Sequence, residues 1–154
     1  MNIEQFIAQC EGKWRSMRSV HSIAFRQFEQ VVSTIYIKLL DYNDPKVLAL
    51  LESNSKENID FVKPFEMIWE ADSNWDSEES NKGNNGSTIL IPIQETDSKG
   101  YILKSMGYAE AIPSCSSYSF LNDGTLILNT EYRNTVSEER IWFLSKFVRC
   151  RSSV

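Results

Sequence analysis

Hydrophobic residues recur along this chain at two spacings, one typical of helices and one typical of strands. The helical spacing appears first, in Ile3, Phe6, Ile7 and Cys10. Asn2 precedes this face as a capping residue, so we predict a short amphipathic helix over residues 2–11. Asp44 is a second capping residue, and Pro45 suits the first position of a helix. These two residues predict a second short helix that ends near Ser53.

Most of the remaining chain has the composition and alternation of β-strands. Trp14 opens one extended stretch, and Asn122-Asp123-Gly124 is a strong hairpin turn. The other predicted strands cover residues 30–40, 65–70, 87–93, 101–109, 117–121, 125–132, 139–144 and 147–154. Short strands with one apolar face and frequent turns are typical of an antiparallel barrel or sandwich. No repeat or internal boundary divides the chain, so we expect one domain over residues 1–154.

Composition narrows the classes of function. The chain has 154 residues and a net charge of -5, which disfavours broad electrostatic binding to nucleic acid or anionic membranes. No apolar run approaches the ~20 residues of a membrane span, and Met1 to Cys10 lacks the pattern of a secretory signal. The three cysteines, Cys10, Cys115 and Cys150, form no CxxC pair. A disulfide framework or zinc site is therefore not expected, and a reducing compartment fits.

Three stretches together carry a family resemblance. They are GKWRSMRSVHSIAF from Gly12, GSTILIPI from Gly86 with GYAE from Gly107, and DGTLILNTEY from Asp123 with EERIWFLSKFVRCRSSV from Glu138. In order and spacing, across nearly the whole chain, they resemble the S-type (CpcS/CpeS) phycobiliprotein lyases. The combination of GKW, RSxH and EERIWF is specific, whereas GKW alone also resembles the first strand of lipocalins. Lys146-Phe147 departs from the Pro-Asn usual in that family, and Cys150 interrupts the two terminal arginines.

This resemblance implies a fold, a reaction and a compartment. The fold would be a lipocalin-like antiparallel β-barrel of about ten strands with two short helices. The reaction would attach phycoerythrobilin or phycocyanobilin, without a metal, through a thioether to a cysteine of an apo-phycobiliprotein subunit of phycoerythrin or phycocyanin type. The compartment would be the cytoplasm in a cyanobacterium or the plastid stroma in an alga. Whether the protein forms a homodimer is left open by the resemblance.

Two alternative functions use the same kind of pocket. The first is a non-catalytic, lipocalin-like bilin carrier or chaperone, which only a transfer assay distinguishes from a lyase. The second is a fatty-acid carrier, whose single carboxylate would need only one cationic contact. Several arginines and a glutamate on the predicted strands therefore disfavour the fatty-acid carrier.

The last predicted strand supplies candidate contacts for a linear tetrapyrrole, which has two propionates, pyrrole N–H groups and an apolar π-surface. Arg149, Arg151 and Ser153 lie two apart, so they share one face of the strand. A guanidinium binds a carboxylate through two parallel hydrogen bonds, which suits a propionate. An exposed charged edge strand would have the same spacing. The resemblance favours bilin binding.

Glu139 is the candidate carboxylate for the pyrrole nitrogens. It shares strand parity with Ile141 and Phe143, whereas Arg140 has the opposite parity. A carboxylate on an apolar face needs a partner, so we expect Glu139 to pair with Arg149 in the empty site. The same spacing would also be found if Glu139 lay at the solvent-exposed end of a strand. The resemblance favours a chromophore contact and a catalytic role for Glu139.

Arg18 and His21 form a second candidate pair near the N-terminus. Because they lie three apart, a straight strand would place them on opposite faces. We therefore expect a turn or bulge near Ser19 that brings both into the cavity. His21 is the only histidine, and because an imidazole can give or take a proton it is a candidate proton donor or acceptor. A lone histidine is nevertheless more often structural.

Aromatic residues supply the candidate walls of the cavity. Met67 and Trp69 share a strand face with Phe65, which suits either a ligand wall or ordinary core. Trp75 lies in the acidic, Asn- and Ser-rich stretch 72–86, and the resemblance favours a flap over the bilin. None of the cysteines has surroundings in sequence that favour a thiolate. The reacting thiol is therefore expected on the acceptor protein.

Overall fold

A computed structural model describes the chain except for residues 23, 55–58, 72–84, 106–113 and 133–134. Within the described residues, nine strands form one antiparallel sheet in which each strand pairs with the next, from β1 to β9. The elements are α1 (Ile3–Cys10), β1 (Gly12–Ser22), β2 (Gln27–Leu39), α2 (Pro45–Ser53), β3 (Phe65–Ala71), β4 (Gly86–Gln94), β5 (Lys99–Lys104), β6 (Ser114–Phe120), β7 (Leu126–Tyr132), β8 (Thr135–Ser145) and β9 (Val148–Ser153). The predicted barrel-like sheet with two short helices is confirmed.

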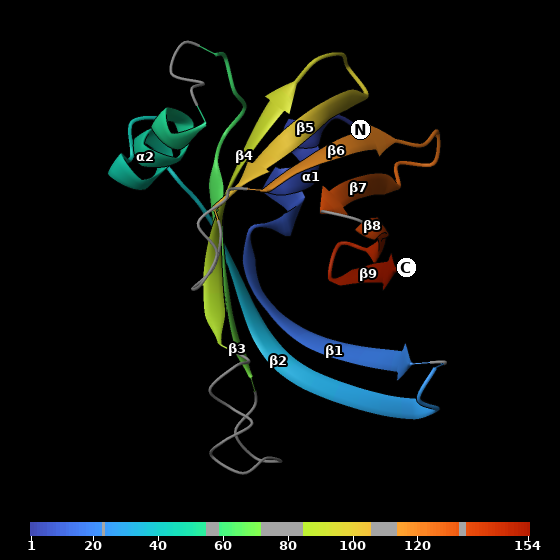
Figure 1. The fold of residues 1–154 in the computed structure, drawn as a ribbon. Coiled ribbons are helices and arrows are strands. Elements are labelled where there is room, and N and C mark those ends of the chain that lie inside the picture. Colours follow the sequence, from blue (N-terminus) through green and yellow to red (C-terminus); the bar gives the residue numbers. More distant parts are fainter. Residues whose placement is uncertain (23, 55–58, 72–84, 106–113, 133–134) are drawn as a thin grey trace.

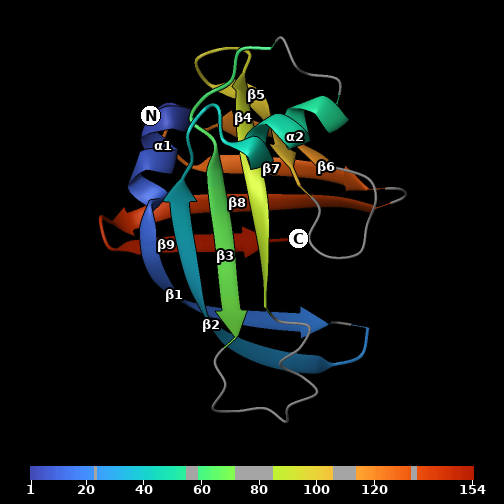
Figure 2. The same cartoon turned by 90° about the vertical axis from the view of Figure 1, so that its left-hand side faces the viewer.

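The sheet curls so that its first and last strands face each other across an open side. Figures 1 and 2 show β1 and β2 sweeping beneath β8 and β9, with α1 inside the curl and α2 outside it. We call the inner side of the sheet the concave face and the outer side the convex face. Directly paired residues of neighbouring strands point to the same side. The register therefore assigns each strand residue to one of the two faces.

Helix α1 fills one end of the concave face. Its capping box is formed as its sequence suggests: the Gln5 backbone N–H donates to Asn2 Oδ1 at 2.9 Å, and the Asn2 N–H donates to Gln5 Oε1 at 3.1 Å. Gly12 has φ +130°, a conformation that favours glycine, and turns the chain from the helix into β1. The helix side chains pack with inward-facing residues of the sheet, including Ile37, Leu90, Ile102, Tyr118, Leu126 and Leu128.

Helix α2 covers the convex face of β4 and β5. Asp44 Oδ1 accepts from the Lys46 backbone N–H at 2.9 Å, which confirms the predicted cap. Val47, Leu50 and Leu51 pack in a second cluster that includes Ile89, Ile91, Ile93 and Leu103. Strand β4 is therefore buried on both faces, which explains its consecutive hydrophobic residues. The concave face beyond α1 has no such cover among the described residues, and it carries most of the candidate site.

Candidate functional site

Strand register confirms that the C-terminal candidates share the concave face. Glu139 pairs with Ser153, Ile141 with Arg151, and Phe143 with Arg149. Ile141 and Phe143 pack against the cluster around α1, so all of these residues face inward. Cys150 pairs with Trp142 on the convex face, as its parity predicts.

Glu139 forms its ion pair with a different arginine from the one expected. Arg151 Nη2 lies 2.9 Å from Glu139 Oε2, and the Glu139 side chain is only 17% exposed. The expected pair with Arg149 is wrong because Arg149 is opposite Phe143, farther along β8. Arg151 is opposite Ile141 and is thus the diagonal neighbour of Glu139.

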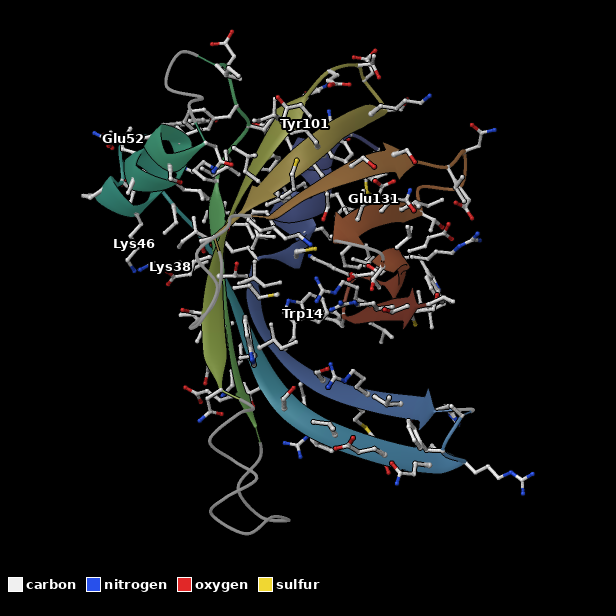
Figure 3. All side chains as sticks on the ribbon, in the orientation of Figure 1. Trp14, Lys38, Lys46, Glu52, Tyr101 and Glu131 are labelled. Carbon is white, nitrogen blue, oxygen red and sulfur yellow. The ribbon has the colours of Figure 1, made fainter. Side chains whose placement is uncertain are left out.

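Arg149 instead joins the last strand to α1 and β1. Its Nη1 donates to Cys10 Sγ at 3.2 Å, and its guanidinium carbon lies 5.3 Å from the centroid of the Trp14 ring. The Trp14 indole N–H donates to the Cys10 carbonyl at 2.7 Å. Trp14 lies where β1 leaves α1, beside the β8–β9 hairpin (Figure 3). This arrangement gives the GKW stretch a structural role at the closed end of the curl.

The Cys10 thiol is therefore next to a cation, contrary to what its sequence surroundings suggest. Burial raises the pKa of the Cys10 thiol, while the charge of Arg149 and its hydrogen bond act in the opposite direction. Because burial has the larger effect, Cys10 is a protonated thiol near neutral pH. It remains unsuited to act as a nucleophile.

Arg18 and His21 do not share a face. Strand β1 pairs with β2 in an unbroken register from Gly12 to Ser22, so the expected bulge near Ser19 is absent. Arg18 lies on the concave face and is exposed. His21 is exposed on the convex face, where its ring lies 4.9 Å from that of Phe28. We therefore assign no proton transfer to His21.

Met67 and Trp69 lie on the concave face, as their alternation predicts. Met67 packs against the cluster around α1. Trp69 is paired with Gly86, and a Cβ atom at position 86 would lie 2.5 Å from Trp69 Cζ2. The absence of a side chain at Gly86 therefore allows the indole to lie across β4. Trp75 falls outside the described residues.

Lys104 is a concave-face cation that the sequence analysis missed. It is paired with Leu90 on one side and Ser114 on the other, and it is half-buried. Burial lowers the pKa of Lys104, Glu139 raises it, and Arg151 lowers it further. The available signal was its parity with Ile102 in β5, but parity does not show that this strand faces β8 and β9 across the curl.

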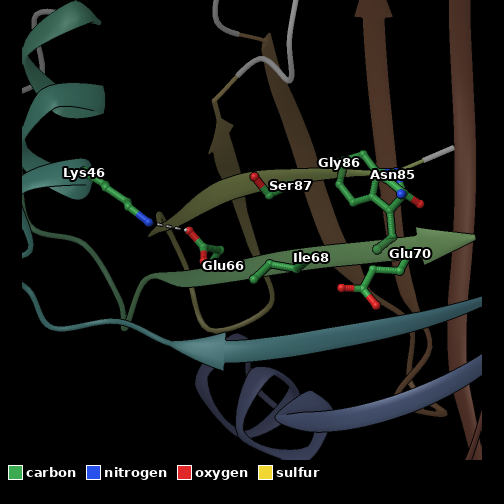
Figure 4. A pocket seen from close by; sticks show the side chains of 8 residues that line it. Lys46, Glu66, Ile68, Glu70, Asn85, Gly86 and Ser87 are labelled. Carbon is green, nitrogen blue, oxygen red and sulfur yellow. Dashed lines mark hydrogen bonds and ion pairs between the residues drawn. The ribbon is translucent and has the colours of Figure 1, made fainter. Parts of the chain in front are cut away.

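A surface pocket of about 470 Å³ lies near α2 and shares only Trp69 with the candidate residues of the concave face (Figure 4). It is lined by Lys46, Glu66, Ile68, Trp69, Glu70, Asn85, Gly86 and Ser87. Lys46 Nζ lies 3.1 Å from Glu66 Oε2, so the lysine is already paired. With no arginine among its lining residues, this pocket matches a dicarboxylate less well than the concave face does.

Neither a metal centre nor a membrane-spanning helix is found in the part of the chain that the structure describes. No three residues among its histidines, cysteines, aspartates and glutamates gather closely enough to hold a metal ion. None of its helices has the length and apolar character needed to cross a bilayer.

The curled antiparallel sheet, with arginines, a carboxylate and tryptophan on its concave face, is a lipocalin-like half-barrel. The family model described as CpeS-like protein matches residues 2–154. The chain therefore belongs to the CpeS-like family, as its sequence motifs predict.

Individual relatives agree with this assignment. The chain is 42% identical over 156 residues to chromophore lyase CpcS/CpeS 3 of Trichodesmium erythraeum, covering 100% of this chain and 88% of the relative. It is 30% identical over 152 residues to phycocyanobilin lyase subunit CpcS of a Picosynechococcus species, covering 97% and 76%. The solved structure of the S-type phycobiliprotein lyase CpeS of Guillardia theta matches with a TM-score of 0.85 and 34% identity, covering 99% of this chain and 81% of that one.

Proposed function

We propose that this protein is a phycobiliprotein chromophore lyase. It binds an open-chain bilin, phycoerythrobilin or phycocyanobilin, and adds it to a cysteine of an apo-phycobiliprotein subunit. The observation that carries the proposal is the concave set of Glu139, Arg149 and Arg151, in a chain whose relatives are named chromophore lyases.

Each part of a bilin has a matching group on the concave face. The arginines offer planar N–H donors to the propionates, and Glu139 offers carboxylate oxygens to the pyrrole N–H groups. Trp69 offers an aromatic surface to the conjugated rings. When a bilin enters, Glu139 exchanges its contact with Arg151 for the pyrrole nitrogens. Arg151 is then available to a propionate.

The proposed bond-forming step is an addition. The acceptor's thiol adds across the ring-A ethylidene double bond: sulfur bonds to the exocyclic carbon, and the proton goes to the adjacent ring carbon. The thioether therefore forms without an oxidant or reductant. The lyase holds the ethylidene in position for the acceptor cysteine and shields the bound bilin from water.

An absorption titration followed by a transfer assay tests this function. Each bilin, added separately, is expected to give a red-shifted, sharpened band and a dissociation constant on the order of micromolar or tighter. Adding an apo-subunit is then expected to yield chromophore that stays attached after denaturation. No spectral change with either bilin would refute the proposal, and binding without transfer would instead support the carrier.

Removing all three cysteines is expected to leave transfer close to the wild-type rate. The variant combines Cys10→Ala, Cys115→Ser and Cys150→Ser, because alanine at position 10 avoids placing a hydroxyl in the core. The raised pKa of Cys10 argues against a thiolate there, and Cys150 lies on the convex face. The measurement is the rate of covalent chromophore formation. A variant that binds bilin but cannot transfer it would reveal a covalent lyase intermediate.

A further inference from the structure

Lys104 reaches the concave face from the opposite side of the curl to β8 and β9. Its own neighbours in the sheet are Leu90 of β4 and Ser114 of β6. Its charge nevertheless interacts with Glu139 of β8 and Arg151 of β9, which are distant in sheet order. Leu90 and Ile102 both pack in the cluster around α1, and Lys104 shares their face, so its side chain projects to the concave side of the curled sheet.

The two concave-face arginines of β9 already have partners. Arg151 pairs with Glu139, and Arg149 contacts Cys10 and Trp14. Among the described residues, no ion pair or side-chain hydrogen bond involves the Lys104 ammonium, although its backbone belongs to the sheet. A half-buried ammonium without such a partner is unfavourable for the empty protein. An anionic ligand would provide the missing partner.

The net charge of the concave-face ionisable groups near Lys104 also matches a dianion. Glu139, Arg149, Arg151 and Lys104 together leave two positive charges at neutral pH. A bilin carries two propionates, so its binding would neutralise them. Cations on both sides of the curl could then hold carboxylates at two separate points.

We propose that Lys104 binds one of the two bilin propionates, while an arginine of β9 binds the other. This inference rests on the proposed function and assigns a specific contact to it. Lys104 acts as a determinant of affinity for the diacid, and it orients the bilin between β5 and β9.

The test compares a bilin with its dimethyl ester, which keeps the rings but lacks both negative charges. Lys104→Met is expected to weaken binding of the free diacid by roughly 10- to 100-fold, the usual range for a lost charge-assisted contact. Binding of the dimethyl ester should change little. Lys104→Arg should retain most of the affinity for the diacid, because it keeps the charge.

Lys38→Met is the matched control. Lys38 is exposed on the convex side of β2 (Figure 3) and should leave both affinities unchanged. If the wild-type protein binds neither bilin, the proposed function itself fails. If it binds the diacid and Lys104→Met behaves like Lys38→Met, only the role of Lys104 fails. An equal loss for diacid and ester would mean that Lys104 acts through packing, which also overturns the proposal.

Stability gives an independent readout. Because burial lowers the pKa of Lys104 below its ordinary 10.5, the folded protein binds its proton less readily than the unfolded chain does. The free energy of unfolding is therefore lowered by the full amount at pH values below the pKa of Lys104 in the folded protein. This loss fades as the pH rises to the pKa of Lys104 in the unfolded chain. Glu139, Arg151 and Cys115 are the other groups that act on this titration.

Lys104→Met should therefore raise the Tm of the bilin-free protein at neutral pH, and the difference should shrink in alkaline buffer. A lysine retained for structure would instead lower the Tm when replaced. If Lys104→Met does not fold, comparing Lys104→Arg with Lys104→Gln gives the same test. Equal diacid affinities for those two variants would overturn the proposal.

Discussion

Replacing Arg149 by alanine is expected to weaken bilin binding by roughly 10- to 100-fold, which corresponds to about 1.5–3 kcal/mol for a lost charge-assisted contact. Arg149 lies on the concave face, and only one of its nitrogens donates to Cys10. Its remaining donors suit a propionate. The measurement is an absorption titration with the bilin that binds the wild-type protein.

Two control variants separate ligand contact from loss of structure. Arg140→Ala removes an arginine from the convex face, where it pairs with Glu138 at 2.9 Å, and should leave bilin affinity nearly unchanged. Cys10→Ala removes the thiol that accepts from Arg149 but keeps the guanidinium. If Cys10→Ala weakens binding as much as Arg149→Ala, Arg149 acts by holding α1 in place. Equal effects of Arg149→Ala and Arg140→Ala would refute the assignment of faces.

Glu139→Gln is expected to separate bilin binding from chromophore tuning and transfer. An ionised carboxylate beside the pyrrole nitrogens stabilises the protonated chromophore, and glutamine keeps a similar size but loses the charge. The bilin should still bind through its propionates. Its red absorption band should shrink or shift to the blue. Transfer should slow by at least roughly 10-fold, because a chromophore that is less protonated presents a less electrophilic ethylidene.

Glu138→Gln is the matched control for this prediction, because it changes the adjacent residue on the other face of β8. Circular dichroism and the Tm should first show that both variants are folded, since Glu139→Gln also leaves Arg151 without its carboxylate. An unchanged bound spectrum together with an unchanged transfer rate would remove Glu139 from the site. A loss of binding as large as that of Arg149→Ala would mean that Glu139 mainly organises the arginines.

Local sequence rules predicted most of the elements because their signals lie within a few residues. Asn2 marks the start of one helix and Asp44 with Pro45 the start of the other, and both caps form as expected. The turn at residues 122–124 joins two strands in the expected hairpin. The predicted bulge near Ser19 is wrong because β1 pairs with β2 without interruption, which leaves Arg18 and His21 on opposite faces. Simple strand alternation gives the observed arrangement.

The sequence by itself determined which strand residues share a face, because side chains alternate with a period of two along any extended strand. It thus grouped Arg149, Arg151 and Glu139, and set Arg140 and Cys150 apart. Only the tertiary structure decided which of these groups meet, because that depends on strand register and on the curl of the sheet. Register paired Glu139 with Arg151, the packing of α1 brought Cys10 to Arg149, and the curl brought Lys104 to the same enclosed space.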